Sequence, residues 1–139
     1  MSPASRTYVL DANAIMDFVE AGPGSGKVAQ LLKDAAQPQT TVMISAVNWG
    51  EVFYSLWQRN GEAVARNVTS RLAKLPFQII AVDVPQALKA GEIKVRHKIP
   101  YVDCLAAALA ALSDATLVTS DRDFEKLGRH FPILWIHRP

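Results

Sequence analysis

The stretch TYVLDANAIMDFVEA, residues 7–21, decides the fold class because it passes directly from a strand pattern into a helix pattern. TYVL (7–10) is a short, uncharged apolar run, which is typical of a buried strand. In the residues that follow, apolar side chains recur at helical spacing: Ile15, Phe18 and Val19. The chain therefore begins as one strand–helix unit of an α/β protein.

The next residues, GPGSGK (22–27), contain most of a phosphate-binding loop. The full pattern needs Gly where Ala21 stands, Ser or Thr where Val28 stands, and a buried strand directly before the loop. The segment before this loop has helical spacing instead. We therefore interpret 22–27 as a connector between two helices, with Gly and Pro at 22–24 ending the first, and we expect no nucleotide cofactor.

The rest of the chain repeats the alternation of strand and helix. Further strands are predicted at TVMI, FQIIAV, ATLVTS and ILWI, residues 41–44, 77–82, 115–120 and 133–136. Helical patterns cover 26–36, 46–60, 62–75, 85–98, 101–112 and 123–128. Ser45 is predicted to cap the N-terminus of the helix at 46–60, and Gly61 is predicted to end it. Because such alternation produces parallel pairing through right-handed crossovers, we predict a three-layer α/β/α fold with a central parallel sheet of about five strands.

Composition indicates one globular domain over residues 1–139. Half of the residues are hydrophobic, a fifth are charged, and the net charge is +2, which is only weak evidence for a polyanionic partner. The single cysteine, Cys104, excludes an internal disulfide and a multi-cysteine zinc site, and we interpret it as a small buried hydrophobe. No signal peptide or membrane span is visible, so we expect a cytoplasmic protein.

Acidic residues follow the predicted strands or lie on helices that reach the same edge of the sheet: Asp11, Glu51, Asp103, Asp121 and Asp123. Ligands of such sheets bind beyond the carboxyl ends of the strands. If the first and fourth strands are neighbours, the acids share one crevice. Each acid also has an ordinary interpretation, because Asp is favoured at helix caps and in first turns, and Glu51 could be the exposed residue of a buried helix.

A cluster of carboxylates is chemically informative. Carboxylates packed together repel one another, and their pKa values rise unless cations neutralise them. Mg²⁺ prefers oxygen ligands and uses carboxylates together with substrate phosphate. Such a site hydrolyses phosphodiesters, because the metal activates water and neutralises charge on the phosphate.

Four segments resemble the signature blocks of the PIN domain, in order: VLDANAIMDF (9–18), ISAVNWGEV (44–52), IPYVDCLAAALA (99–110) and TLVTSDRDF (116–124). More narrowly, they resemble the VapC-type toxins of bacterial toxin–antitoxin pairs. The resemblance spans nearly the whole chain. It implies an Mg²⁺- or Mn²⁺-dependent endoribonuclease that leaves 5′-phosphate and 3′-hydroxyl ends. It also implies a homodimer and a small antitoxin whose tail enters the active groove.

The resemblance also implies roles for individual residues. The acidic quartet falls on Asp11, Glu51, Asp103 and Asp121, with supporting polar residues at Asn13, Ser45 and Thr119. Some family members have Asn at the position of Asp121 and the acid at that of Asp123. The metal-ligand set therefore includes both, and which is the main ligand stays open: Asp11, Asp103, Asp121 and Asp123.

The sequence gives weaker evidence for the surfaces that bind substrate and partner than for the acidic site. A metal–carboxylate site needs positive charge around it to hold RNA. Candidates for this role, which are equally explained as a solvated helix end, are Lys94, Arg96, Lys98 and Arg122. Core packing or a partner surface would account for four aromatic residues near Glu51: Trp49, Phe53, Tyr54 and Trp57.

Two other functions remain as alternatives. A non-catalytic PIN-like module that binds RNA or protein would leave the acids unexplained. A phosphatase that uses Asp11 as its nucleophile would need a second Asp where Asn13 stands, so we rank it last.

Overall fold

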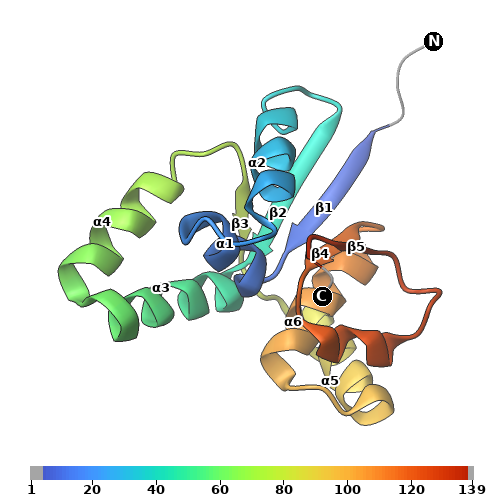
Figure 1. Cartoon of the computed structure of the whole chain (residues 1–139). Helices are drawn as coiled ribbons and strands as arrows, with labels where there is room; N and C mark the ends of the chain where they lie inside the picture. Colours follow the sequence, from blue (N-terminus) through green and yellow to red (C-terminus); the bar gives the residue numbers. More distant parts are fainter. Residues whose placement is uncertain (1–4, 138–139) are drawn as a thin grey trace.

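The computed structural model describes residues 5–137, which build one five-stranded sheet between layers of helices (Figure 1). The strands are β1 (Arg6–Leu10), β2 (Thr40–Ser45), β3 (Gln78–Ile80), β4 (Thr116–Thr119) and β5 (Ile133–Trp135). Their order is β3-β2-β1-β4-β5, and every neighbouring pair is parallel. The predicted α/β/α class with a five-stranded parallel sheet is confirmed.

The helices match the predicted ranges to within a few residues. They are α1 (Ala12–Val19), α2 (Ser25–Asp34), α3 (Ala46–Asn60), α4 (Glu62–Leu72), α5 (Val84–His97) and α6 (Tyr101–Leu112). The predicted short helix after β4 is the 3-10 helix η1 (Arg122–Leu127). β3 is shorter than the predicted strand 77–82, because it pairs only with Met43 to Ser45 at the end of β2 and has no partner strand beyond that.

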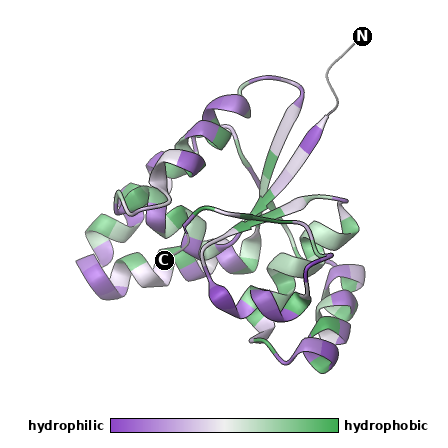
Figure 2. Ribbon diagram, turned by 45° about the vertical axis from the view of Figure 1, so that its right-hand side comes forward, coloured by the Kyte–Doolittle hydropathy of each residue, from purple (hydrophilic) through white to green (hydrophobic). Residues whose placement is uncertain are grey.

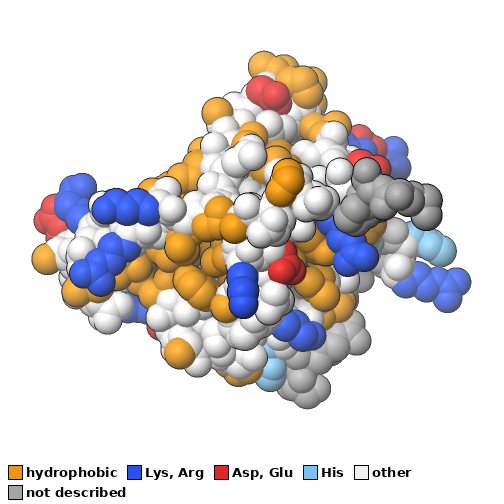
Figure 3. All heavy atoms as spheres, turned by 90° about the horizontal axis from the view of Figure 1, so that it is seen from above, with side chains coloured by type: hydrophobic (Ala, Val, Ile, Leu, Met, Phe, Trp, Pro, Cys, Tyr) orange, Lys and Arg blue, Asp and Glu red, His pale blue; other side chains and the backbone are white. Residues whose placement is uncertain are grey.

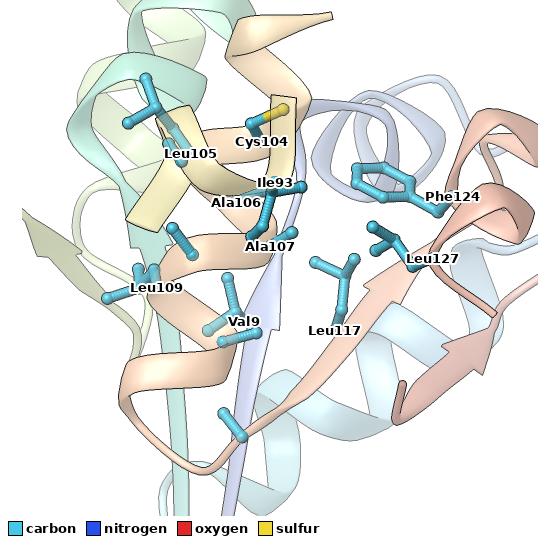
Figure 4. Close-up of a cluster of buried hydrophobic side chains, with 14 of the residues drawn as sticks. Val9, Ile93, Cys104, Leu105, Ala106, Ala107, Leu109, Leu117, Phe124 and Leu127 are labelled. Carbon is cyan, nitrogen blue, oxygen red and sulfur yellow. The ribbon is translucent and has the colours of Figure 1, made fainter. Parts of the chain in front are cut away.

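The core lies on both faces of the sheet. Val9 and Leu117 face one cluster, formed with α6 and η1 (Figure 4), whereas Leu10 and Val118 face the other, formed with α1, α2 and α3. All four side chains are fully buried, so this part of β1 and β4 is apolar on both faces. In Figure 2, β1 changes from purple at its start, next to the N-terminal trace, to green toward the middle of the molecule. Cys104 is also fully buried, which confirms its interpretation as a small hydrophobe.

The glycine-rich segment connects two helices, as predicted. Gly24 donates its N–H to Asp17 Oδ2 at 2.8 Å, and a Cβ added at Gly22 would lie 2.2 Å from Asp17 Oδ1. The carboxylate of Asp17 therefore closes over this turn and explains its glycines. Lys27, the lysine of the apparent phosphate loop, donates to the carbonyl of Trp135 at 3.1 Å.

The aromatic side chains of α3 are only partly buried. Trp49 contacts the ring of Phe77 at a centroid distance of 5.6 Å, and Phe53 meets Trp57 edge-on at 5.7 Å. Tyr54 and Trp57 are 51% and 40% exposed, so core packing accounts for only part of this aromatic group. Within the described residues, no helix is long and apolar enough to cross a membrane.

Candidate metal centre

The carboxyl ends of β1 and β4 lie next to each other. Leu10 pairs with Val118, and Asp11 donates its backbone N–H to the carbonyl of Val118 at 3.3 Å. The first and fourth strands are thus neighbours, as the sequence interpretation required. Asp11 and Asp121 consequently leave the sheet at the same edge.

Asp11 has two structural contacts and sits beside the other acids. Its Oδ1 accepts the N–H of Ala14 at 2.8 Å, which caps α1, and its Oδ2 accepts the hydroxyl of Thr119. The side chain is almost completely buried. The pKa of Asp11 is raised to about 7, mainly by burial. The hydrogen bonds from Thr119 and Ala14 work against this rise, and the nearby charges of Asp121 and Asp103 add to it.

Three further carboxylates gather closely enough to share one ion. One oxygen each of Asp103, Asp121 and Asp123 lies within 4.8 Å of the others, and all three residues are half buried. Asp121 Oδ1 also accepts the N–H of Asp123 at 2.9 Å and so caps η1. Burial first, and then Asp121, Glu51 and Asp123, raise the pKa of Asp103 to about 7.

Glu51 approaches this group from α3. Burial raises its pKa, a hydrogen bond from Asn48 lowers it, and the charge of Asp121 raises it. Asn48 itself is buried, and its Nδ2 donates to Glu51 Oε1 at 3.4 Å and to the carbonyl of Val102 at 3.3 Å. It thereby ties α3 to α6 one residue before Asp103. The sequence interpretation did not include Asn48, although an amide one helical turn before Glu51 in an apolar helix was an available signal.

The three predicted supporting residues have different positions. Thr119 is buried; its hydroxyl donates to Asp11 and accepts the N–H of Asp121 at 2.9 Å, so it connects two of the acids. Ser45 is the N-cap of α3, as predicted, with its hydroxyl accepting the N–H of Val47 at 3.3 Å. Asn13 is exposed on α1.

Three of the four candidate RNA-binding residues make contacts with groups outside the carboxylate cluster. Lys94 donates to the carbonyl of Ile99 at 2.9 Å. Arg96 pairs with Glu92 at 3.4 Å, and Arg122 pairs with Glu125 at 3.0 Å. Lys98 ends α5 with a left-handed backbone. These contacts fit the helix-end interpretation, and an RNA-binding role for these residues stays a prediction.

Thr119 provides a first test of how this group is held. We expect Thr119→Val to lose the two hydrogen bonds that join Asp11 to Asp121 and to destabilise the protein by about 1–3 kcal/mol. Thr119→Ser keeps the hydroxyl and should recover most of this loss. Urea unfolding of both variants measures the difference. Equal stability of the Val and Ser variants would show that the hydroxyl does not hold the acids in place.

An all-parallel α/β/α protein with carboxylates gathered at the ends of its central strands is a recognisable class, and comparison with known proteins identifies it. The family model described as PIN domain matches residues 8–130. The chain belongs to the PIN domain family. No curated protein sequence matches it significantly.

Solved structures of toxin–antitoxin proteins share this fold. A DNA-bound VapBC from Salmonella typhimurium superposes with a TM-score of 0.75 at 16% identity, covering 95% of this chain and 99% of that one. A toxin–antitoxin complex from Klebsiella pneumoniae gives 0.70 at 20% identity, with coverage of 95% and 99%. VapC20 of Mycobacterium tuberculosis, described as a sarcin–ricin loop cleaving toxin, gives 0.69 at 23% identity, with coverage of 87% and 95%.

Proposed function

We propose that this PIN domain is a single-domain, metal-dependent endoribonuclease and the toxin of a toxin–antitoxin pair in the cytoplasm. The observation that carries the proposal is the group of acids at the carboxyl edge of the sheet. Asp103 is its central member, because the charges of Asp121, Glu51 and Asp123 all act on it. An enzyme that cleaves a phosphodiester without a metal would not gather negative charge where phosphate must bind.

The donor set fits Mg²⁺ or Mn²⁺. Both ions favour carboxylate oxygens, and one oxygen each of Asp103, Asp121 and Asp123 lies within 4.8 Å of the others. These three residues would hold the ion, with Asp11 and Glu51 beside them. A bound ion supplies Lewis-acid activation of water and neutralises charge on the scissile phosphate.

The chain's own residues keep this set in place. The cap of α1 fixes one oxygen of Asp11, and the hydroxyl of Thr119 fixes the other. Asn48 sets the distance between Glu51 on α3 and the start of α6, where Asp103 lies. We propose that the exposed cations at the end of α5 and on η1 hold the RNA backbone around it: Lys94, Arg96, Lys98 and Arg122.

An antitoxin partner is supported by the neighbours, several of which are described as toxin–antitoxin complexes. The surface offers room for such a partner. Two apolar hollows of about 390 and 360 Å³ adjoin each other near α1, α2 and α4 and share Phe18 and Leu75. Seen from above in Figure 3, apolar side chains gather left of centre, with Lys and Arg around them. A small protein encoded by the adjacent open reading frame should bind the purified chain.

The decisive experiment is cleavage of a labelled bulk RNA pool by the purified protein with Mg²⁺, with Mn²⁺ and with EDTA. Cleavage that requires the metal and leaves 5′-phosphate ends supports the proposal. Absence of cleavage, together with absence of Mn²⁺ binding in a titration, would instead support a non-catalytic PIN module.

A further inference from the structure

One face of α3 leads from the candidate metal centre to an exposed tyrosine. Val47, Glu51 and Tyr54 follow one another at steps of four and three residues, so they share this face of the helix. Glu51 marks the end of the face at the metal centre, because Asn48 bonds both to Glu51 and to the carbonyl of the residue before Asp103. Tyr54 is thus the neighbour of Glu51, one helical turn further along α3.

Tyr54 has no partner for its ring or its hydroxyl among residues 5–137. Its side chain is 51% exposed, no other ring packs against it, and its hydroxyl makes no hydrogen bond. Trp57 on the same helix is different, because its ring packs against Phe53 and lies under the guanidinium of Arg66 at 5.6 Å. A large aromatic side chain left uncovered beside a functional centre is typical of a binding surface.

The space beside this ring is open because residue 50 is glycine. In an α-helix each side chain leans toward the N-terminus, so Tyr54 points back over the turn that contains Gly50. A Cβ added at Gly50 would meet no atom within 4 Å, so neither this ring nor another described side chain fills the space. Glycine weakens a helix relative to alanine, and no close contact within the described residues requires it here.

The chemistry of this surface suits a nucleotide base. Proteins bind unpaired RNA largely by stacking its bases on exposed aromatic rings. Side chains three residues apart on a helix are direct neighbours, so a phosphate at the metal centre beside Glu51 places an adjoining base within reach of Tyr54. Val47, Gly50 and Tyr54 carry no charge, so this surface offers nothing to a phosphate but presents a flat ring to a base.

We infer that Tyr54 is a stacking platform for an unpaired RNA base next to the scissile phosphate, with the space over Gly50 receiving that base. The inference rests on the proposed ribonuclease function and defines its substrate further, as RNA that is single-stranded at the cleavage site. Stacking on an aromatic ring accepts every base, so Tyr54 positions the strand without selecting a sequence.

The test compares two short labelled probes of equal length and charge: an oligouridine and the same ribose–phosphate chain without bases. Binding is measured by fluorescence anisotropy in Ca²⁺, a cation that also takes oxygen ligands. We expect the wild-type protein to bind the oligouridine about 5- to 150-fold more tightly than the base-free probe, and Tyr54→Ala to lose most of this preference.

Three further variants separate stacking from a structural effect. Tyr54→Phe should keep the preference, because the hydroxyl has no partner. Trp57→Leu removes another exposed aromatic ring of α3, one that Arg66 already covers, and should also keep it. Gly50→Leu should lose the preference by filling the open space. Leu favours helix more than Gly does, so unfolding of α3 cannot explain that loss, and circular dichroism verifies it.

The kinetics of RNA cleavage give an independent measure. Tyr54→Ala should raise KM by a similar factor with little change in kcat, because stacking holds the substrate and the transition state alike. A disturbed metal centre would lower kcat instead.

Equal binding of both probes by the wild-type protein would overturn the inference, and so would an unchanged preference in Tyr54→Ala. Tyr54 would then belong to a surface that contacts protein. Failure of the proposed function has a different signature, in which the wild-type protein neither cleaves RNA in Mg²⁺ or Mn²⁺ nor binds either probe, and the inference would fall with it.

Discussion

Asp103→Asn is expected to reduce metal-dependent RNA cleavage by about 100- to 1,000-fold or more while the protein stays folded. The substitution keeps the size of the side chain and removes the charge that would bind the ion. The pKa of Asp103 is raised to about 7 by burial and by three neighbouring carboxylates, so its charge is costly without a metal. Loss of activity without loss of structure is therefore the specific result expected of a metal ligand.

Asp114→Asn is the matched control. Asp114 follows the other end of α6, is exposed, and has a left-handed φ of 51° that Asn tolerates well. We expect this variant to cleave like the wild-type protein. Wild-type activity in Asp103→Asn, prepared identically, would mean that the cleavage comes from a contaminant or that the metal lies elsewhere.

The elements that the sequence predicted best are those with clear boundary residues. The range 46–60 was predicted for α3 and is observed, because Ser45 caps its start and Gly61, with a φ of 91°, ends it. α6 matches 101–112 because Pro100 precedes it and Ser113 and Asp114 follow. The gathering of acids was also predictable, since parallel strands bring the residues after their carboxyl ends to one edge.

Other features depend on packing that a sequence pattern does not encode. The bond from Asn48 to the carbonyl of Val102 exists only because α3 packs against α6, and these residues lie 54 positions apart. The hydrogen bond from the hydroxyl of Thr119 to Asp11 likewise depends on tertiary packing, because it joins residues 108 positions apart. The sequence pattern also does not predict that Leu88 on α5 is 71% exposed, because an apolar residue on an amphipathic helix is ordinarily assigned to the core.

Metal and pH are expected to change the stability of this protein together. Burial raises the pKa of Asp11 from 3.8 to about 7, and the pKa of Asp103 rises similarly. Between about pH 4 and about pH 7, Asp11 and Asp103 therefore keep protons in the folded protein that they have released in the unfolded chain. Stability from these groups is therefore present below about pH 4 and is lost as the pH rises through about 7.

In EDTA, we expect the stability contribution of these groups to fall by an amount on the order of 2 kcal/mol between pH 5 and pH 8. Thermal melts of Asp11→Asn and Asp103→Asn measured beside the wild-type protein isolate this contribution, because each variant should show a shallower pH dependence and a higher melting temperature at pH 8.

Mn²⁺ should reverse the loss at pH 8. A ligand that binds only the folded state, present at 100 times its dissociation constant, stabilises by about 2.7 kcal/mol, which corresponds to several degrees in melting temperature. Asp103→Asn should show little of this metal effect, whereas Asp114→Asn should show all of it. A melting temperature that does not respond to Mn²⁺ in the wild-type protein, or that responds equally in Asp103→Asn, would contradict the assignment of these carboxylates as the metal site.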